Sequence, residues 1–197
     1  MRERGLAAVG YFYVDFHDHK KREARGLLSS LLVQLGTQSD RFFEILSKLH
    51  AVHNRGGEKP SKEELEMCLK DMLNCPGQAP VFIVIDALDE YPDSRSPGSP
   101  PGVPTPRRWV LTILKGLTEL KLPNLHLCLT SRPEVDIQKV LELLGPVSVS
   151  LHTQKGQLDA IAQYVESIVV ADFAMKSWSK KTKKLVIDTL VSKSHGM

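Results

Sequence analysis

The sequence predicts an α/β fold built around a parallel sheet. Short runs of β-branched and aromatic residues alternate along the chain with longer segments in which apolar residues recur at helical spacing. One short run, VFIVI at residues 81–85, is apolar throughout, which is typical of a strand buried on both faces of a sheet flanked by helices. Strands that are separated by helices in this way pair in parallel.

Four runs are expected to form the strands. The first, VGYFYVDF, is short and combines aromatic with β-branched residues, as strands do. The others are VFIVIDAL, LHLCLT and VSVSL. We place the four strands at residues 9–16, 81–88, 125–130 and 147–151.

The segments between these runs are expected to form helices. Ser61 and Glu64 have the spacing of a capping box, in which each side chain accepts a hydrogen bond from the other residue's backbone N–H. A short helix is expected after Pro133, ending near Gly145. The other helical patterns cover residues 27–35, 39–49, 65–73, 110–120, 158–168 and 185–191.

Residues 91–106 differ in kind from the rest of the chain. They contain six prolines, and serine and glycine fill much of the space between them. Proline removes backbone donors, so we expect a flexible surface insertion without regular structure. Strand and helix patterns resume directly afterwards, which argues against a linker between domains. A PxxP ligand is the less common alternative.

Composition and charge exclude several classes of protein. The net charge of +3 is small, and the lysines around Trp178 are better explained as a solvated helix face than as a nucleic-acid-binding stripe. No apolar stretch reaches the roughly 18 residues needed to cross a bilayer, and no signal peptide is evident. The three cysteines form no CxxC pair, which favours reduced thiols. We expect a cytoplasmic protein that binds neither nucleic acid nor membrane.

Carboxylates follow the apolar run VFIVI. Asp86, Asp89 and Glu90 are all within residues 86–90. Ligands of open α/β sheets bind at the carboxyl ends of the strands, and a divalent ion would relieve the repulsion among these groups. In NTP hydrolysis, one such Asp holds Mg²⁺ and a further acid orients or deprotonates the attacking water.

A cation follows the next strand, because LHLCLT leads into Ser131, Arg132 and Pro133. A guanidinium at this edge can bind a phosphate bidentately. Taken alone, Arg132 is better explained as a surface arginine, and Asp86 equally well as a strand end that turns into solvent. Their occurrence after two successive strands of one sheet favours a nucleotide site.

Several motifs resemble the NACHT family of STAND NTPases. VFIVIDALDE resembles its Walker B motif, in which a small residue, here Ala87, follows the metal-binding Asp. LCLTSRP is similar to the family's sensor-1 strand. YFYVDF followed by LLSSLLVQL resembles the second strand and helix of the fungal NACHT group with nephrocystin-like N-terminal modules. The final KSHGM is similar to the start of that group's conserved stretch beyond the core.

The resemblance implies a P-loop NTPase of the ASCE and STAND type, a three-layer sandwich around a parallel sheet. It implies a NACHT core at residues 1–152 and the start of a post-core helical region at 153–197. In the intact protein, ATP and ADP would switch the chain between closed and homo-oligomeric states, in NLR-like signalling of self/non-self or immune type. Hydrolysis would be slow.

The resemblance also assigns roles to the residues at the sheet edge. Asp86 is the expected Mg²⁺ ligand. Glu90 is expected to serve hydrolysis, with Asp89 as the competing choice. Arg132, together with Ser131, is the expected sensor of the γ-phosphate.

One family motif is absent from these 197 residues. The family binds phosphates with GxxxxGK[ST], and the sequence contains no Gly-Lys dipeptide. We therefore expect an internal fragment of a longer protein, without the first strand of the core, which lies between the third and fourth strands present. By itself it should bind little or no ATP and Mg²⁺. The alternative is a non-catalytic remnant or a protein-interaction module.

Overall fold

The structure is a computed structural model, and it describes residues 6–15, 17–95, 98, 100, 102–145, 147 and 155–194. The chain divides into two compact units, Met1–Gly145 and Pro146–Met197. The boundary expected after residue 152 lies outside the described residues, and so does the expected fourth strand at 147–151, apart from Val147.

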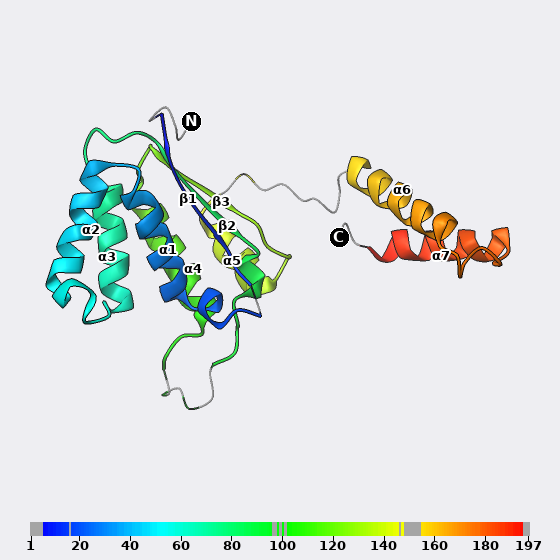
Figure 1. Cartoon of the computed structure of the whole chain (residues 1–197), viewed down its shortest axis with the longest axis horizontal. Helices are drawn as coiled ribbons and strands as arrows, with labels where there is room; N and C mark the ends of the chain where they lie inside the picture. The colour runs from blue at the N-terminus through cyan, green and yellow to red at the C-terminus, as the bar shows by residue number, and fades with distance from the viewer. Residues whose placement is uncertain are drawn as a thin grey trace. The chain divides into compact units, whose positions relative to one another are not determined.

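The first unit contains a three-stranded sheet in which both pairs of neighbours are parallel, in the order β1-β2-β3 (Figure 1). The strands are β1 (Ala8–Tyr13), β2 (Val81–Asp86) and β3 (Leu125–Leu129). The expected parallel pairing of the first three strands is therefore confirmed. β1 ends three residues before the expected end at residue 16, and β2 ends at Asp86, where the chain turns into a short 3₁₀ helix, η4 (Leu88–Glu90).

Among the described residues of this unit, five α-helices accompany the sheet. Ser61 caps the third, and the expected capping box is confirmed: the Glu64 N–H donates to Ser61 Oγ at 3.1 Å, and the Ser61 N–H donates to Glu64 Oε2 at 2.6 Å. The helices are α1 (Ala24–Gly36), α2 (Asp40–Val52), α3 (Lys62–Leu73), α4 (Pro106–Glu119) and α5 (Val135–Leu143), with 3₁₀ turns η2 (His19–Arg22) and η3 (Asn54–Gly56).

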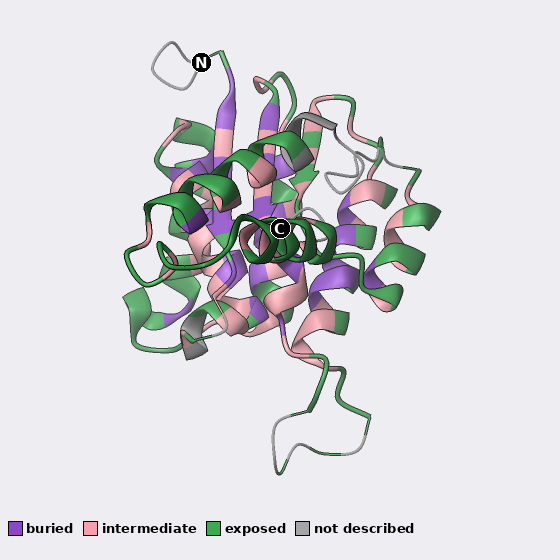
Figure 2. Cartoon of the chain, turned by 90° about the vertical axis from the view of Figure 1, so that its right-hand side faces the viewer, coloured by how far each residue is buried: buried purple, intermediate pink, exposed green. Residues whose placement is uncertain are grey.

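The helices of this unit pack against one face of the sheet, and that face belongs to the hydrophobic core (Figure 2). Tyr11 and Tyr13, which point to the other face, are 46% and 57% exposed. Phe82 and Val84 of β2 are only half-buried there. The expectation that β2 is buried on both faces is wrong for this reason. The residues of the helix-covered face are Ala8, Gly10, Phe12, Val81, Ile83, Ile85, Leu125, Leu127 and Leu129.

Two glutamines close the outer edge of β1: Gln34 in α1 and Gln38, which follows the end of that helix. Gln38 Oε1 accepts from the N–H of Val9 and Gln38 Nε2 donates to the carbonyl of Val9, each at 2.9 Å. Gln34 makes the same pair of bonds with Tyr11: its Oε1 accepts from the Tyr11 N–H at 3.1 Å, and its Nε2 donates to the Tyr11 carbonyl at 2.8 Å. Each amide replaces the peptide group of a further strand, so this edge is closed at both residues. Within the described part of the chain, no side chain holds the backbone of β3 similarly.

The proline-rich insertion is anchored at both ends. Between Tyr91 and Thr105, the described residues form no helix or strand, as expected. Tyr91, however, is fully buried, so the insertion does not begin at this residue. Pro106 also lies outside it, because this residue is the first of α4, and Thr105 caps the helix by accepting from the N–H of Arg108. Proline is tolerated at a first helical position, where its missing N–H has no helical partner.

The second unit is a pair of helices, α6 (Lys155–Ala171) and α7 (Lys180–Lys193), that pack on each other. Ser179 caps α7 by accepting from the N–H of Thr182 at 3.1 Å. In the part of the chain that the structure describes, no helix is both long and apolar enough to cross a membrane.

Candidate functional site

The ends of β2 and β3 are joined through the side chain of Thr130. The Thr130 hydroxyl donates to Asp86 Oδ1 and accepts from the N–H of Ala87 at 2.9 Å. Its backbone continues the pairing, because the Thr130 N–H donates to Ile85 O at 3.0 Å and Thr130 O accepts from the N–H of Leu88 at 2.9 Å. Asp86 therefore has one carboxylate oxygen held in place, while the other has no partner among the described residues.

Ala87 adopts a left-handed conformation, with φ 58° and ψ 49°. This conformation costs an L-residue roughly 1–2 kcal/mol, and the cost rises for branched side chains. The turn directs the chain from β2 into η4, which places Asp89 and Glu90 beside the sheet edge. The left-handed turn therefore explains why a small residue, Ala87, follows Asp86.

Asp89 and Arg132 form the second connection between the two strand ends. Asp89 Oδ1 accepts from the backbone N–H of Arg132 at 2.9 Å, and Asp89 Oδ2 lies 3.5 Å from Arg132 Nε. The Asp89 side chain is only 11% exposed, whereas that of Arg132 is 71% exposed. The Asp89 carboxylate is thus mostly buried, while the Arg132 guanidinium faces solvent.

Arg107, at the start of α4, holds the backbone of the loop that follows β2. Its Nη2 donates to Asp89 O at 2.7 Å and its Nε to Tyr91 O at 2.9 Å, while Nη1 lies 3.4 Å from Asp136 Oδ1. The Arg107 side chain is 12% exposed. Burial raises the pKa of the phenol of Tyr91, whose backbone carbonyl accepts from Arg107 Nε. The Asp89 backbone is therefore fixed by a mostly buried cation.

The structure brings together Asp86, Asp89 and Arg132 of the residues predicted from the sequence. Glu90 is half-buried on the same 3₁₀ turn, and its N–H donates to Ala87 O at 2.9 Å. Ser131 is exposed, and its hydroxyl donates to the carbonyl of Arg132 at 2.7 Å.

Sequence reasoning missed two residues that hold the candidate site together, Thr130 and Arg107. Thr130 had a detectable signal, since a hydroxyl at a strand end next to a strand that ends in Asp is placed to orient the carboxylate. Arg107 had none, because it follows the proline-rich insertion and reaches the loop only through the packing of α4.

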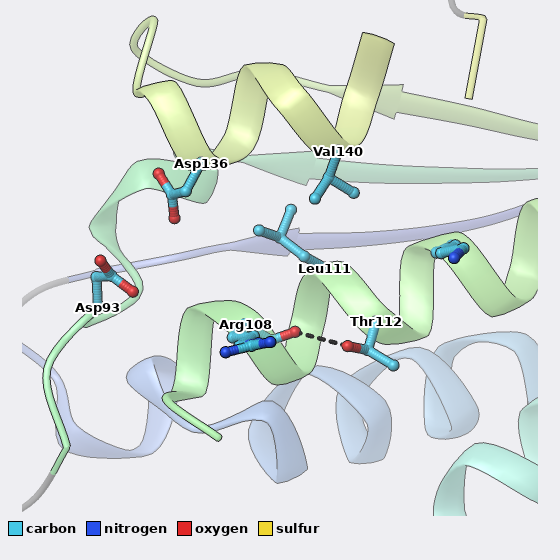
Figure 3. A pocket seen from close by; sticks show the side chains of 7 residues that line it. Asp93, Arg108, Leu111, Thr112, Asp136 and Val140 are labelled. Carbon is cyan, nitrogen blue, oxygen red and sulfur yellow. Dashed lines mark hydrogen bonds between the residues drawn. The ribbon is translucent and has the colours of Figure 1, made fainter. Parts of the chain in front are cut away.

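A cavity of about 340 Å³ lies between α4 and α5, and neither the carboxylates Asp86, Asp89 and Glu90 nor Arg132 lines it (Figure 3). Its wall mixes charges of both signs with apolar side chains, a lining that selects no single class of ligand. We base the site on the sheet edge, where the carboxylates and the guanidinium converge. The cavity is lined by Asp93, Arg108, Leu111, Lys115, Asp136 and Val140, among others.

The chemistry of the edge is that of hard oxygen donors beside one cation. In the described residues, no group of three or more His, Cys, Asp or Glu side chains could hold a metal ion by itself. Mg²⁺ commonly takes one or two protein carboxylates and completes its shell with water and phosphate oxygens. The second Asp86 oxygen, which has no partner among the described residues, suits such a shared site, and Arg132 suits an anion next to it.

Comparisons with known proteins identify the family of the chain. No curated protein and no solved structure matches the chain. The family model described as Nephrocystin 3, N-terminal matches residues 1–132, a region that contains all three strands and ends at Arg132. Since this match covers more than half of the 197 residues, the chain belongs to the nephrocystin-3 N-terminal family.

Proposed function

We propose that the edge formed by the ends of β2 and β3 binds Mg²⁺ and the terminal phosphate of ATP, as part of a NACHT-type P-loop NTPase of the STAND class. The observation that carries the proposal is the pair of links between the ends of two parallel strands: Thr130 bonds Asp86, and Asp89 bonds Arg132. Membership of the nephrocystin-3 N-terminal family supports it. So does the order of the strands, in which both acidic and cationic ends lie at one edge.

Asp86 is the residue that would hold Mg²⁺, through its remaining carboxylate oxygen and with phosphate and water oxygens as the other ligands. Bound there, Mg²⁺ would neutralise charge on the phosphates. Thr130 orients the Asp86 carboxylate, and Arg132 with Ser131 faces the γ-phosphate. Glu90 orients the attacking water.

The proposed role in the cell is that of a switch. ATP and ADP would select between closed and homo-oligomeric states of the intact protein, in NLR-like signalling such as fungal self/non-self recognition, and hydrolysis would reset the switch. A cytoplasmic location fits the three cysteines, none of which forms a disulfide.

The backbone edge of β3 fits the same proposal. It lacks the side-chain closure that Gln34 and Gln38 give to β1. The resemblance places the strand that leads into the phosphate loop beside β3. Phosphate affinity in this fold comes largely from N–H groups at a helix N-terminus and one Lys, so we expect the 197-residue chain to bind Mg-ATP only in the millimolar range, where the binding free energy is about −4 kcal/mol.

The proposal is tested by titrating Mg-ATP into two proteins: the 197-residue chain, and the same chain joined to an upstream strand–GxxxxGK[ST]–helix segment. The extended protein should bind at least about 100-fold more tightly, a difference of about 2.7 kcal/mol. Equal, negligible binding by both would favour the alternative of a non-catalytic remnant or protein-interaction module. Micromolar binding by the shorter chain would contradict the assigned role of the phosphate loop.

Variants of the extended protein separate the roles. Asp86→Asn should weaken magnesium-dependent binding, and Glu90→Gln should keep binding but abolish turnover. Arg132→Ala should reduce discrimination between ATP and ADP, since each lost charge-assisted bond contributes about 1.5–3 kcal/mol. Asp93→Asn, which removes a carboxylate outside the site, is the control. Wild-type behaviour in all three variants would refute the nucleotide site.

A further inference from the structure

Asp89 and Glu90 are neighbours on η4, and both were candidates for the acid that serves hydrolysis. The contacts of Asp89 bear on which of the two can take that role. Both carboxylate oxygens of Asp89 face Arg132, one against its backbone N–H and one against Nε. Because both oxygens are engaged with Arg132, Asp89 is poorly placed to orient an attacking water.

We infer that Asp89 is a positioning residue that orients Arg132 toward phosphate, and that it takes no part in proton transfer. This inference rests on the proposed function and assigns a role within the same site. A guanidinium presents donors along two sides: the Nε side and the end formed by Nη1 and Nη2. Asp89 occupies the Nε side at 3.5 Å. Neither Nη atom has a partner among the described residues, so the end of the fork is left for an anion.

The carboxylate can orient Arg132 because it is itself held. Arg107 Nη2 donates to Asp89 O at 2.7 Å, and Arg107 also contacts Asp136 of α5. The Asp89 side chain is 11% exposed, so its position depends on packing, whereas the 71% exposed Arg132 side chain would otherwise sample many rotamers. Holding Nε reduces this freedom before phosphate binds, which lowers the entropic cost of binding.

The ion pair is tested first in the ligand-free 197-residue chain by NMR of arginine side chains. The Nε–H of Arg132 should give a resolved resonance that exchanges slowly with solvent. Asp89→Asn keeps an oxygen for the Arg132 backbone N–H but removes the charge beside Nε, and should accelerate exchange about tenfold, the equivalent of about 1.4 kcal/mol. Asp93→Asn should leave the resonance unchanged. An Nε signal that is insensitive to Asp89→Asn would overturn the inference.

The orienting role is tested by measuring the affinities of Mg-ATP and Mg-ADP by calorimetry in the extended protein that carries the upstream strand–GxxxxGK[ST]–helix segment, since this readout does not need the Arg132 side chain. Asp89→Asn should reduce the preference for ATP about 3- to 10-fold, and the double variant with Arg132→Ala should match Arg132→Ala alone. A purely structural role would weaken both nucleotides equally, which would overturn the inference. Additive losses would do so too, because they place Asp89 on the ligand.

The two proposals fail in different ways. If the wild-type chain shows the protected Nε–H but the extended protein binds neither nucleotide, the proposed function fails while the Asp89–Arg132 pair stands. If the nucleotides bind and prefer ATP but Nε is unprotected, the site stands and Asp89 loses its positioning role.

Discussion

The two faces of the sheet are built on the same three strands but from different residues. The covered face carries alanine, glycine, valine, isoleucine, leucine and one phenylalanine, and Ile83 and Ile85 in its centre are 0% and 1% exposed. The second face carries Tyr11, Tyr13 and His126, all exposed. The residues that stabilise the fold and those of the candidate site thus lie on different faces of the sheet. The covered face supplies the hydrophobic core, whereas Asp86 and Thr130 follow the alternation of the second face.

The largest effect is expected at the centre of the covered face. Ile83→Ala should destabilise the chain by about 2–5 kcal/mol, because it removes buried apolar volume and leaves a cavity. Urea unfolding followed by circular dichroism measures the change. A loss below about 1 kcal/mol would show that this face is not the core.

A smaller effect is expected at the closed edge. Gln38→Ala leaves the N–H and C=O of Val9 without partners and should cost about 1–3 kcal/mol in the free energy of unfolding. Gln38→Glu is the matched variant, since its carboxylate still accepts from the Val9 N–H but cannot donate to the Val9 carbonyl. We expect it to fall between Ala and wild type. Equal stability of all three proteins would mean that water replaces the amide at no cost.

Substitutions of Ala87 test the turn that leads from β2 into η4. Ala87→Val places a β-branched side chain in a left-handed conformation and should destabilise by about 1–2 kcal/mol. Ala87→Gly should be close to neutral, because glycine adopts this conformation without strain but loses more entropy on folding. Thermal unfolding of the two variants gives the comparison, and the reverse order would refute the strain.

The smallest effect is expected on the second face. Tyr13→Thr keeps the preference for a strand and removes a side chain that is 57% exposed, so its stability should stay within about 0.5 kcal/mol of wild type. The same urea titration as for Ile83→Ala applies. A loss that approaches the value for Ile83→Ala would show that the second face is buried in solution, as the sequence of β2 suggests.

Local patterns of the sequence determined the elements and the chemistry of the strand ends. Helical spacing of leucines, the capping box at Ser61 and the run VFIVI depend on near neighbours, and the structure confirms the helix cap and the parallel pairing. The acids after β2 and the arginine after β3 could be proposed as partners because parallel strands end at the same edge. The roles of Asp86, Glu90 and Arg132 in binding nucleotide stay predictions.

Tertiary structure alone decided how these groups meet. The sequence could not show that the second face of β2 is half-open, since an apolar strand reads the same whether or not helices cover both sides. It could not find Arg107, whose contact with Asp89 crosses 18 positions and depends on the packing of α4. Nor could it show that Asp89 contacts Arg132, because that contact forms only when the turn at Ala87 brings the carboxylate against the end of β3.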